Sequence, residues 1–110
     1  MSGISVLANT SLKNSNDTIT VNPISGSKTI TSIAASLFAG SLVLANRKKM
    51  VVRNEDPSNR FRVGPSGVTQ QSGFPIEPGG TAEFTFDPTT AISIYAISEG
   101  AAIVAQVIEL

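Results

Sequence analysis

Apolar and polar residues alternate along most of this chain, which is the pattern that half-buried β-strands produce. The alternation first appears in residues 17–23, where Ile19 and Val21 stand between threonines and an asparagine. Residues 28–33 repeat the alternation. Serine and glycine dominate the intervening residues 24–27, so we expect two strands joined by a turn.

The alternation becomes steady from residue 49 onward. Met50 and Val52 share one face of the segment 49–54, and Phe61 and Val63 share one face of the next apolar segment. A Pro-containing turn separates the two segments, which predicts a β-hairpin. Further strands are expected at 81–87, 91–98 and 101–109, a short one at 68–72, turns at 65–67 and 99–100, and a Gly/Pro-rich loop at 73–80.

Residues 34–46 fit neither periodicity. Their apolar positions Leu37, Phe38, Leu42 and Val43 have the spacing of neither a helix nor a strand. A short helical turn followed by a strand is one description of this stretch. A buried strand with a bulge at Gly40 is the other, and the one we favour.

The number and spacing of these segments indicate an all-β fold. Seven to nine short antiparallel strands with frequent turns are typical of a β-sandwich or jelly roll. The last strand is apolar on both faces, so it is central in its sheet or its second face meets another subunit. We expect residues 1–16, which are rich in serine and asparagine, to form an extended arm, and residues 17–110 a single domain.

The composition excludes most classes of catalytic site. The 110 residues include no cysteine and no histidine, so thiol and imidazole nucleophile systems and zinc sites have no ligands or bases. Carboxylates remain, but Asp56 and Asp87 precede prolines as turn-initiating residues do, and the others fall in turns or on polar strand faces. We therefore expect no enzyme and no cofactor. The apolar-rich run 33–45 is too short to span a bilayer, so no membrane partner is expected.

Charge is unevenly distributed although the formal net charge is zero. Residues 47–62 carry six basic groups against two acids, and residues 63–110 carry five acids and no base. A nucleic-acid binder would be basic overall and would interleave aromatics, so we favour a solvated face or a contact between proteins. The candidate interface residues are the basic Arg47, Lys48, Lys49, Arg53, Arg60 and Arg62, and the loop residues Phe74 and Ile76.

Three stretches resemble a pattern found in small phage and prophage virion proteins. They read LANRKKMVVRNEDPSNRFRVG (44–64), SGFPIEPGGTAEFTF (72–86) and IYAISEGAAIVAQVIE (94–109). The resemblance implies a β-sandwich building block that serves as a capsid decoration (cement) protein on the capsid exterior, made in the host cytoplasm. Its implied partners are the major capsid protein or another virion protein, and copies of itself, with a trimer favoured. A tail protein, head–tail adaptor or fibre base is the alternative, and a carbohydrate- or nucleic-acid-binding module a further one.

Overall fold

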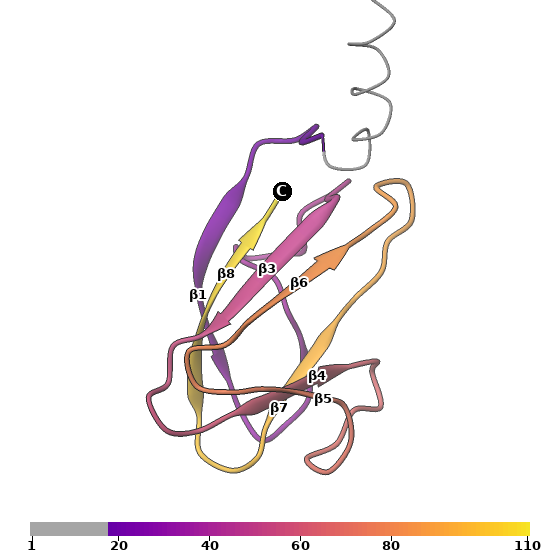
Figure 1. Cartoon of the computed structure of the whole chain (residues 1–110). Helices are drawn as coiled ribbons and strands as arrows, with labels where there is room; N and C mark the ends of the chain where they lie inside the picture. Colours follow the sequence, from indigo (N-terminus) through magenta and orange to yellow (C-terminus); the bar gives the residue numbers. More distant parts are fainter. Residues whose placement is uncertain (1–17) are drawn as a thin grey trace, which may run out of the picture.

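Strand pairing divides the chain into two four-stranded antiparallel sheets (Figure 1). The computed structural model describes residues 18–110, and this part contains no helix. One sheet has the order β1-β8-β3-β6 and the other β2-β7-β4-β5. The strands are β1 (Ile24–Ile30), β2 (Ala35–Ser36), β3 (Lys49–Asn54), β4 (Phe61–Gly64), β5 (Phe74–Ile76), β6 (Thr81–Thr85), β7 (Tyr95–Ser98) and β8 (Ile103–Glu109).

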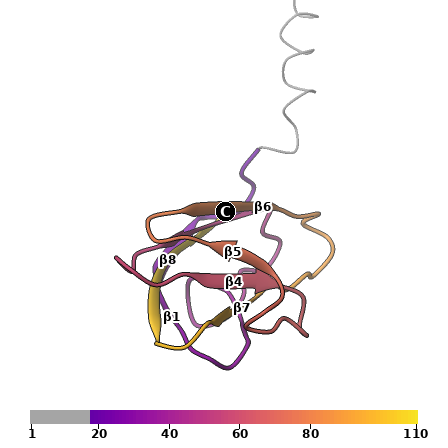
Figure 2. The ribbon, with the colours of Figure 1, turned by 60° about the horizontal axis from the view of Figure 1, so that its bottom comes forward.

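The order of pairing is that of a jelly roll. Strand β1 pairs with β8, β2 with β7, β3 with β6, and β4 with β5, so the first half of the described chain runs antiparallel to the second. The pair β3–β8 completes one sheet and the pair β4–β7 completes the other. A long double ribbon wrapped in this way gives two facing sheets (Figure 2), which confirms the all-β prediction and the expected range of strand number.

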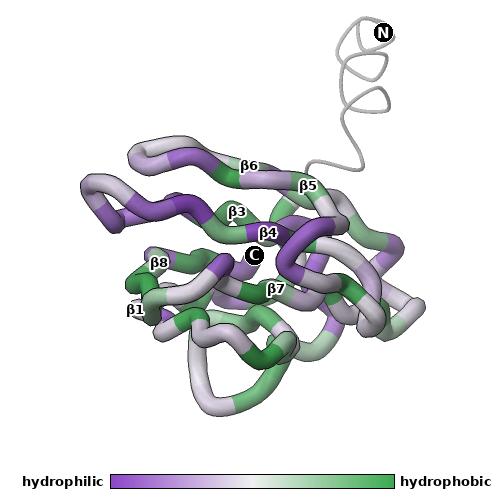
Figure 3. The backbone as a smooth tube through the Cα atoms, turned by 90° about the horizontal axis from the view of Figure 1, so that it is seen from below, coloured by the Kyte–Doolittle hydropathy of each residue, from purple (hydrophilic) through white to green (hydrophobic). Residues whose placement is uncertain are grey.

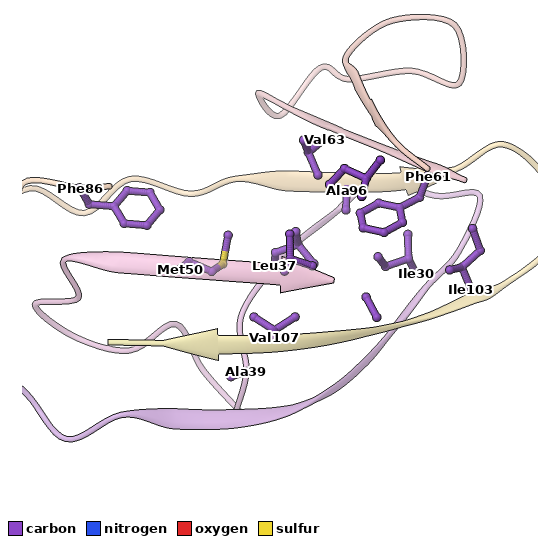
Figure 4. Close-up of a cluster of buried hydrophobic side chains, with 13 residues drawn as sticks. Ile30, Leu37, Ala39, Met50, Phe61, Val63, Phe86, Ala96, Ile103 and Val107 are labelled. Carbon is purple, nitrogen blue, oxygen red and sulfur yellow. The ribbon is translucent and has the colours of Figure 1, made fainter. Parts of the chain in front are cut away.

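The hydrophobic core lies between the two sheets (Figure 4). Met50 and Val52 from β3 face Phe61 and Val63 from β4, and all four side chains are buried as the alternation predicts. Strand β8 is central in its sheet, between β1 and β3, and contributes Val107 to the core. The central position accounts for one part of its apolar character, because its inner face is wholly buried.

The beginning of the described chain differs from the prediction. Residues 18–23 belong to no strand, and residues 24–27, expected to turn, form the first half of β1. Gly26 explains the difference, since a Cβ atom there would lie 2.5 Å from the carbonyl oxygen of Ala39. The glycine permits a close approach of two backbone segments and does not mark a turn. The predicted arm, residues 1–16, lies outside the described residues.

Four further expectations are corrected by the structure. Residues 34–46 contain only the two-residue β2, with neither a helical turn nor a long bulged strand, and residues 68–72 form no strand. The Gly/Pro-rich loop contains the short strand β5. The segments 49–54 and 61–64 do not form a hairpin, because β3 and β4 belong to different sheets. The chain likewise changes sheets at the turn between β7 and β8.

Candidate functional site

The carboxylates have structural roles in the described part of the chain. Asp56 accepts hydrogen bonds from the backbone amides of Ser58 and Asn59, at 3.0 and 2.6 Å. Asp87 accepts from the amide of Thr89 at 2.9 Å. These backbone donors favour the charged form and lower the pKa of both aspartates. Both residues therefore stabilise turns, which agrees with the sequence interpretation.

Glu109 differs from these turn-stabilising aspartates, because it is fully buried. One carboxylate oxygen accepts from the backbone amide of Ala39 at 2.8 Å. The other accepts from the amide of Leu44 at 3.1 Å and from the Arg47 guanidinium at 2.7 Å. The carboxylate therefore fixes the irregular segment between β2 and β3 to the end of β8. Glu109 has the same strand parity as Val107, so the alternation in the sequence places its side chain on the inner face of β8.

Arg47 is the buried partner in this ion pair. Its side chain is 4% exposed, which corrects its placement among the accessible interface residues. The guanidinium also donates to the carbonyl oxygen of Ile92 at 2.8 Å and lies 4.3 Å from the centroid of the Phe86 ring. It thus joins the β2–β3 segment to the β6–β7 connection. Nothing in the sequence near Arg47 distinguished it from the cations that follow.

Four of the remaining basic candidates lie on two opposite outer faces. Lys49 on β3 pairs with Glu83 on the neighbouring β6 at 3.2 Å, and Arg53 pairs with Glu55 at 3.0 Å. Arg60 and Arg62 lie with the other sheet, so they do not share a face with Arg53. Lys48, next to Lys49, is half-buried. A single continuous basic surface is therefore not formed by these residues.

Arg60 and Arg62 converge on an acidic residue of the same chain. Glu99 accepts from Arg62 at 2.7 Å and from Arg60 at 2.9 Å, and Arg60 also reaches Glu77 at 3.3 Å. The hydrogen bond from Arg62, and to a lesser extent that from Arg60, lowers the pKa of Glu99. The hydrogen bonds to Glu77 and Glu99 in turn raise the pKa of Arg60. The cluster borders a polar hollow of about 460 Å³ between the loops at this end of the sandwich.

The two apolar candidates differ in accessibility. Phe74 is 68% exposed, whereas Ile76 is buried opposite Phe61 in the core. Ile76 is therefore not a surface residue, contrary to its predicted place. At the other end of the molecule, Val43 and Ile92 are exposed and line a hollow of about 310 Å³. The sequence did not single out this second apolar feature, because its two sides come from segments far apart in the chain.

Two features are absent from residues 18–110. No group of three or more histidine, cysteine, aspartate or glutamate side chains is placed to hold a metal ion. No helix long and apolar enough to cross a membrane occurs there either. What the geometry offers is a set of exposed apolar residues and open strand edges on a surface whose charged groups are largely paired.

No protein-family model matches the sequence, and no curated protein matches it. Among solved structures, the fold is similar to a chain from Bacillus endospore appendages, described as a novel family of disulfide-linked pili. The TM-score is 0.51 at 15% sequence identity, and the match covers 84% of this chain and 87% of that chain. At this identity the likeness shows a shared all-β fold.

Proposed function

We propose that this chain is a non-enzymatic structural subunit that assembles with copies of itself. The observation that carries the proposal is the apolar end of the molecule, where exposed Val43 and Ile92 line a hollow beside the largely exposed Leu42. Grouped apolar side chains on a small protein mark surfaces that other protein covers. The likeness to a pilus-forming chain supports the same class of function.

Sedimentation velocity over a range of concentrations, with electron microscopy of the same samples, tests this proposal. We expect regular oligomers or polymers that dissociate on dilution. A Leu42→Asp variant should weaken them, while Thr31→Asp, an exposed polar position in the β1–β2 connection, should not. A protein that remains monomeric at every concentration would contradict self-assembly.

Within this class, we propose a bacteriophage capsid decoration protein on the capsid exterior, with tail, head–tail adaptor or fibre-base protein as the alternative. The sequence resemblance in residues 44–109 supports this narrower role. Binding of the purified protein to expanded, undecorated capsids of the source particle is the direct test. Attachment to tails would favour the alternative, and attachment to neither would remove both.

A filament subunit is the second candidate, favoured by the likeness to the endospore appendage chain. Those pili are described as disulfide-linked, but this chain contains no cysteine. A filament of this protein would therefore be held by non-covalent contacts. We expect reducing agents to leave its length unchanged and denaturants to dissociate it.

The pairing of Arg60 and Arg62 with Glu99 changes how the predicted basic interface should be tested. Reversing both arginines would leave Glu99 among like charges, so a loss of assembly could arise from the monomer itself. Replacing Arg53, whose ion pair with Glu55 is exposed, is the cleaner test of a charge contact between subunits. The involvement of these residues in an interface stays a prediction.

A further inference from the structure

Strand β6 has one open side. It is the edge strand of its sheet, and no strand of the described chain pairs with its second side (Figure 1). Just beyond its ends, the amide of Phe86 donates to Lys48 and the carbonyl of Gly80 accepts from Asn54. Hydrogen bonding alternates along an antiparallel pair, so the even-numbered residues of β6 bond to β3. The odd-numbered residues Thr81, Glu83 and Thr85 therefore direct their backbone amides and carbonyls away from the sheet.

The other edge strands carry features that discourage strand addition. On β1, Lys28 lies opposite the buried Ala105 and so faces inward, with its ammonium 3.5 Å from the Phe38 ring centroid. An inward-facing charge on an edge strand is a known protection. Strand β5 contains Pro75, which has no amide to donate, and β2 has only two residues. Strand β6 has five residues and contains neither proline nor lysine.

A segment with the alternation of a strand precedes β1, the other edge strand of the same sheet. Residues 19–22 alternate as Ile-Thr-Val-Asn, yet they belong to no strand, and Ile19 is 53% exposed. The inner face of β6 offers matching apolar contacts, because Ala82 and Phe84 are only partly buried. Exposed Phe74 lies on the adjacent edge strand β5, on the same side of the sandwich (Figure 3).

The segment cannot reach the open side of β6 in its own chain. It leads into β1, and the position beyond β6 is four strand spacings away, about 19 Å at about 4.8 Å per spacing. Only Pro23 separates Asn22 from Ile24, and these two residue steps reach about 7 Å. A strand added to β6 must therefore come from another molecule.

We propose that residues 19–22 of one copy add as a strand to the open edge of β6 in a second copy. Ile19 and Val21 would cover Ala82 and Phe84, and Thr20 would lie beside Glu83 on the outer face. Repetition of this contact links copies head to tail, because each copy carries one donor segment and one acceptor edge. The inference rests on the proposed self-assembly and adds a second contact, between strand edges, to the one at the apolar end.

Disulfide trapping tests the contact directly, since the natural chain has no cysteine. Thr20→Cys protein is mixed with Glu83→Cys protein of different tag length, and mixed dimers are counted under oxidising, non-reducing conditions. Central residues of both segments are chosen so that parallel and antiparallel addition both bring the cysteines together. The matched control replaces Glu83→Cys with Ser27→Cys on the outer face of β1. We expect mixed dimers to form at least about tenfold faster with Cys at 83, because docking raises the local concentration.

A second measurement follows assembly without cysteines. The Ile19→Asn/Val21→Asn variant should raise the apparent dissociation constant about tenfold or more, since two apolar contacts are lost. Ile33→Asn, which changes another exposed isoleucine, should leave the constant within about twofold. Thermal unfolding of dilute monomer should be unchanged in both.

The outcomes separate this inference from the proposed function. Assembly that persists in the Ile19→Asn/Val21→Asn variant, without trapping at Glu83, would overturn the strand addition and leave self-assembly standing. Preferential trapping between two Glu83→Cys copies would also overturn it, because β6 would then pair with β6. A wild-type protein that never assembles would remove both proposals.

Discussion

Replacing Arg47 by methionine tests the buried ion pair between Arg47 and Glu109. Methionine keeps an unbranched apolar stem beside Phe86 and Met50 but removes the charge. Glu109, which is fully buried, would keep its two backbone donors and lose its cationic partner. The carbonyl oxygen of Ile92 would lose its Arg47 donor as well.

The expected loss follows from this burial. Removing one partner of a buried ion pair costs about 3–5 kcal/mol, because the other charge remains desolvated without its counter-charge. Exposed ion pairs contribute only about 0–1 kcal/mol. Arg53→Met, which breaks the exposed pair with Glu55, is therefore the matched control. For a domain of this size, Arg47→Met should lower the melting temperature by at least about 12 °C, at about 4 °C or more per kcal/mol.

Urea unfolding followed by far-UV circular dichroism measures the difference, since the chain has no tryptophan for fluorescence. A double-mutant cycle with Glu109→Gln then isolates the pair. Once the charge of Glu109 is removed, the added cost of Arg47→Met should fall well below its cost in the wild type. Equal losses for Arg47→Met and Arg53→Met, or strictly additive losses in the cycle, would refute the reasoning.

Three further predictions use the same unfolding assay. The lowered pKa of Glu99 means that its bonds from Arg62 stabilise the fold above its ordinary pKa of 4.5, and that this stabilisation is lost as the pH falls through the lower, folded-state pKa. The difference between wild type and Glu99→Gln should therefore vanish in acid, and a constant difference would contradict the assignment. Gly73→Ala should lower the free energy of unfolding more than Gly79→Ala does. Both glycines have positive φ, but only at Gly73 would a Cβ atom clash, at 2.5 Å from a side-chain atom. Equal losses of stability would exclude the clash. Asn54→Ala should cost about 2 kcal/mol or more, since the buried amide bonds two carbonyl oxygens, and a loss under about 0.5 kcal/mol would show that water replaces it.

Local alternation was sufficient to predict which side chains of β3 and β4 enter the core. Met50 and Val52 on β3, and Phe61 and Val63 on β4, are buried as their parity requires, while Arg53 and Arg62 face outward. The reason is that side-chain direction in a strand depends only on position along it. The fold class followed from the number of such segments and the turns between them.

Strand partners could not be predicted, because pairing depends on contacts far apart in the sequence. The turn at 55–59 suggested a hairpin, yet β3 pairs with β6 and β8. The same limitation concealed the candidate surfaces. The apolar hollow combines Val43 with Ile92, and the buried ion pair joins Arg47 to Glu109. Only the folded topology brings these residues together.

The pairing order also explains the uneven charge of the sequence. Because the second half of the jelly roll lies antiparallel to the first, acids near the C-terminus meet bases from the middle of the chain. The β3–β6 pair brings Lys49 to Glu83, and the β4–β7 pair brings Arg62 to Glu99. A charge asymmetry that suggested an external partner is thus largely neutralised within one molecule. Contacts between molecules are then better sought where backbone edges and apolar side chains remain open, as they do along β6.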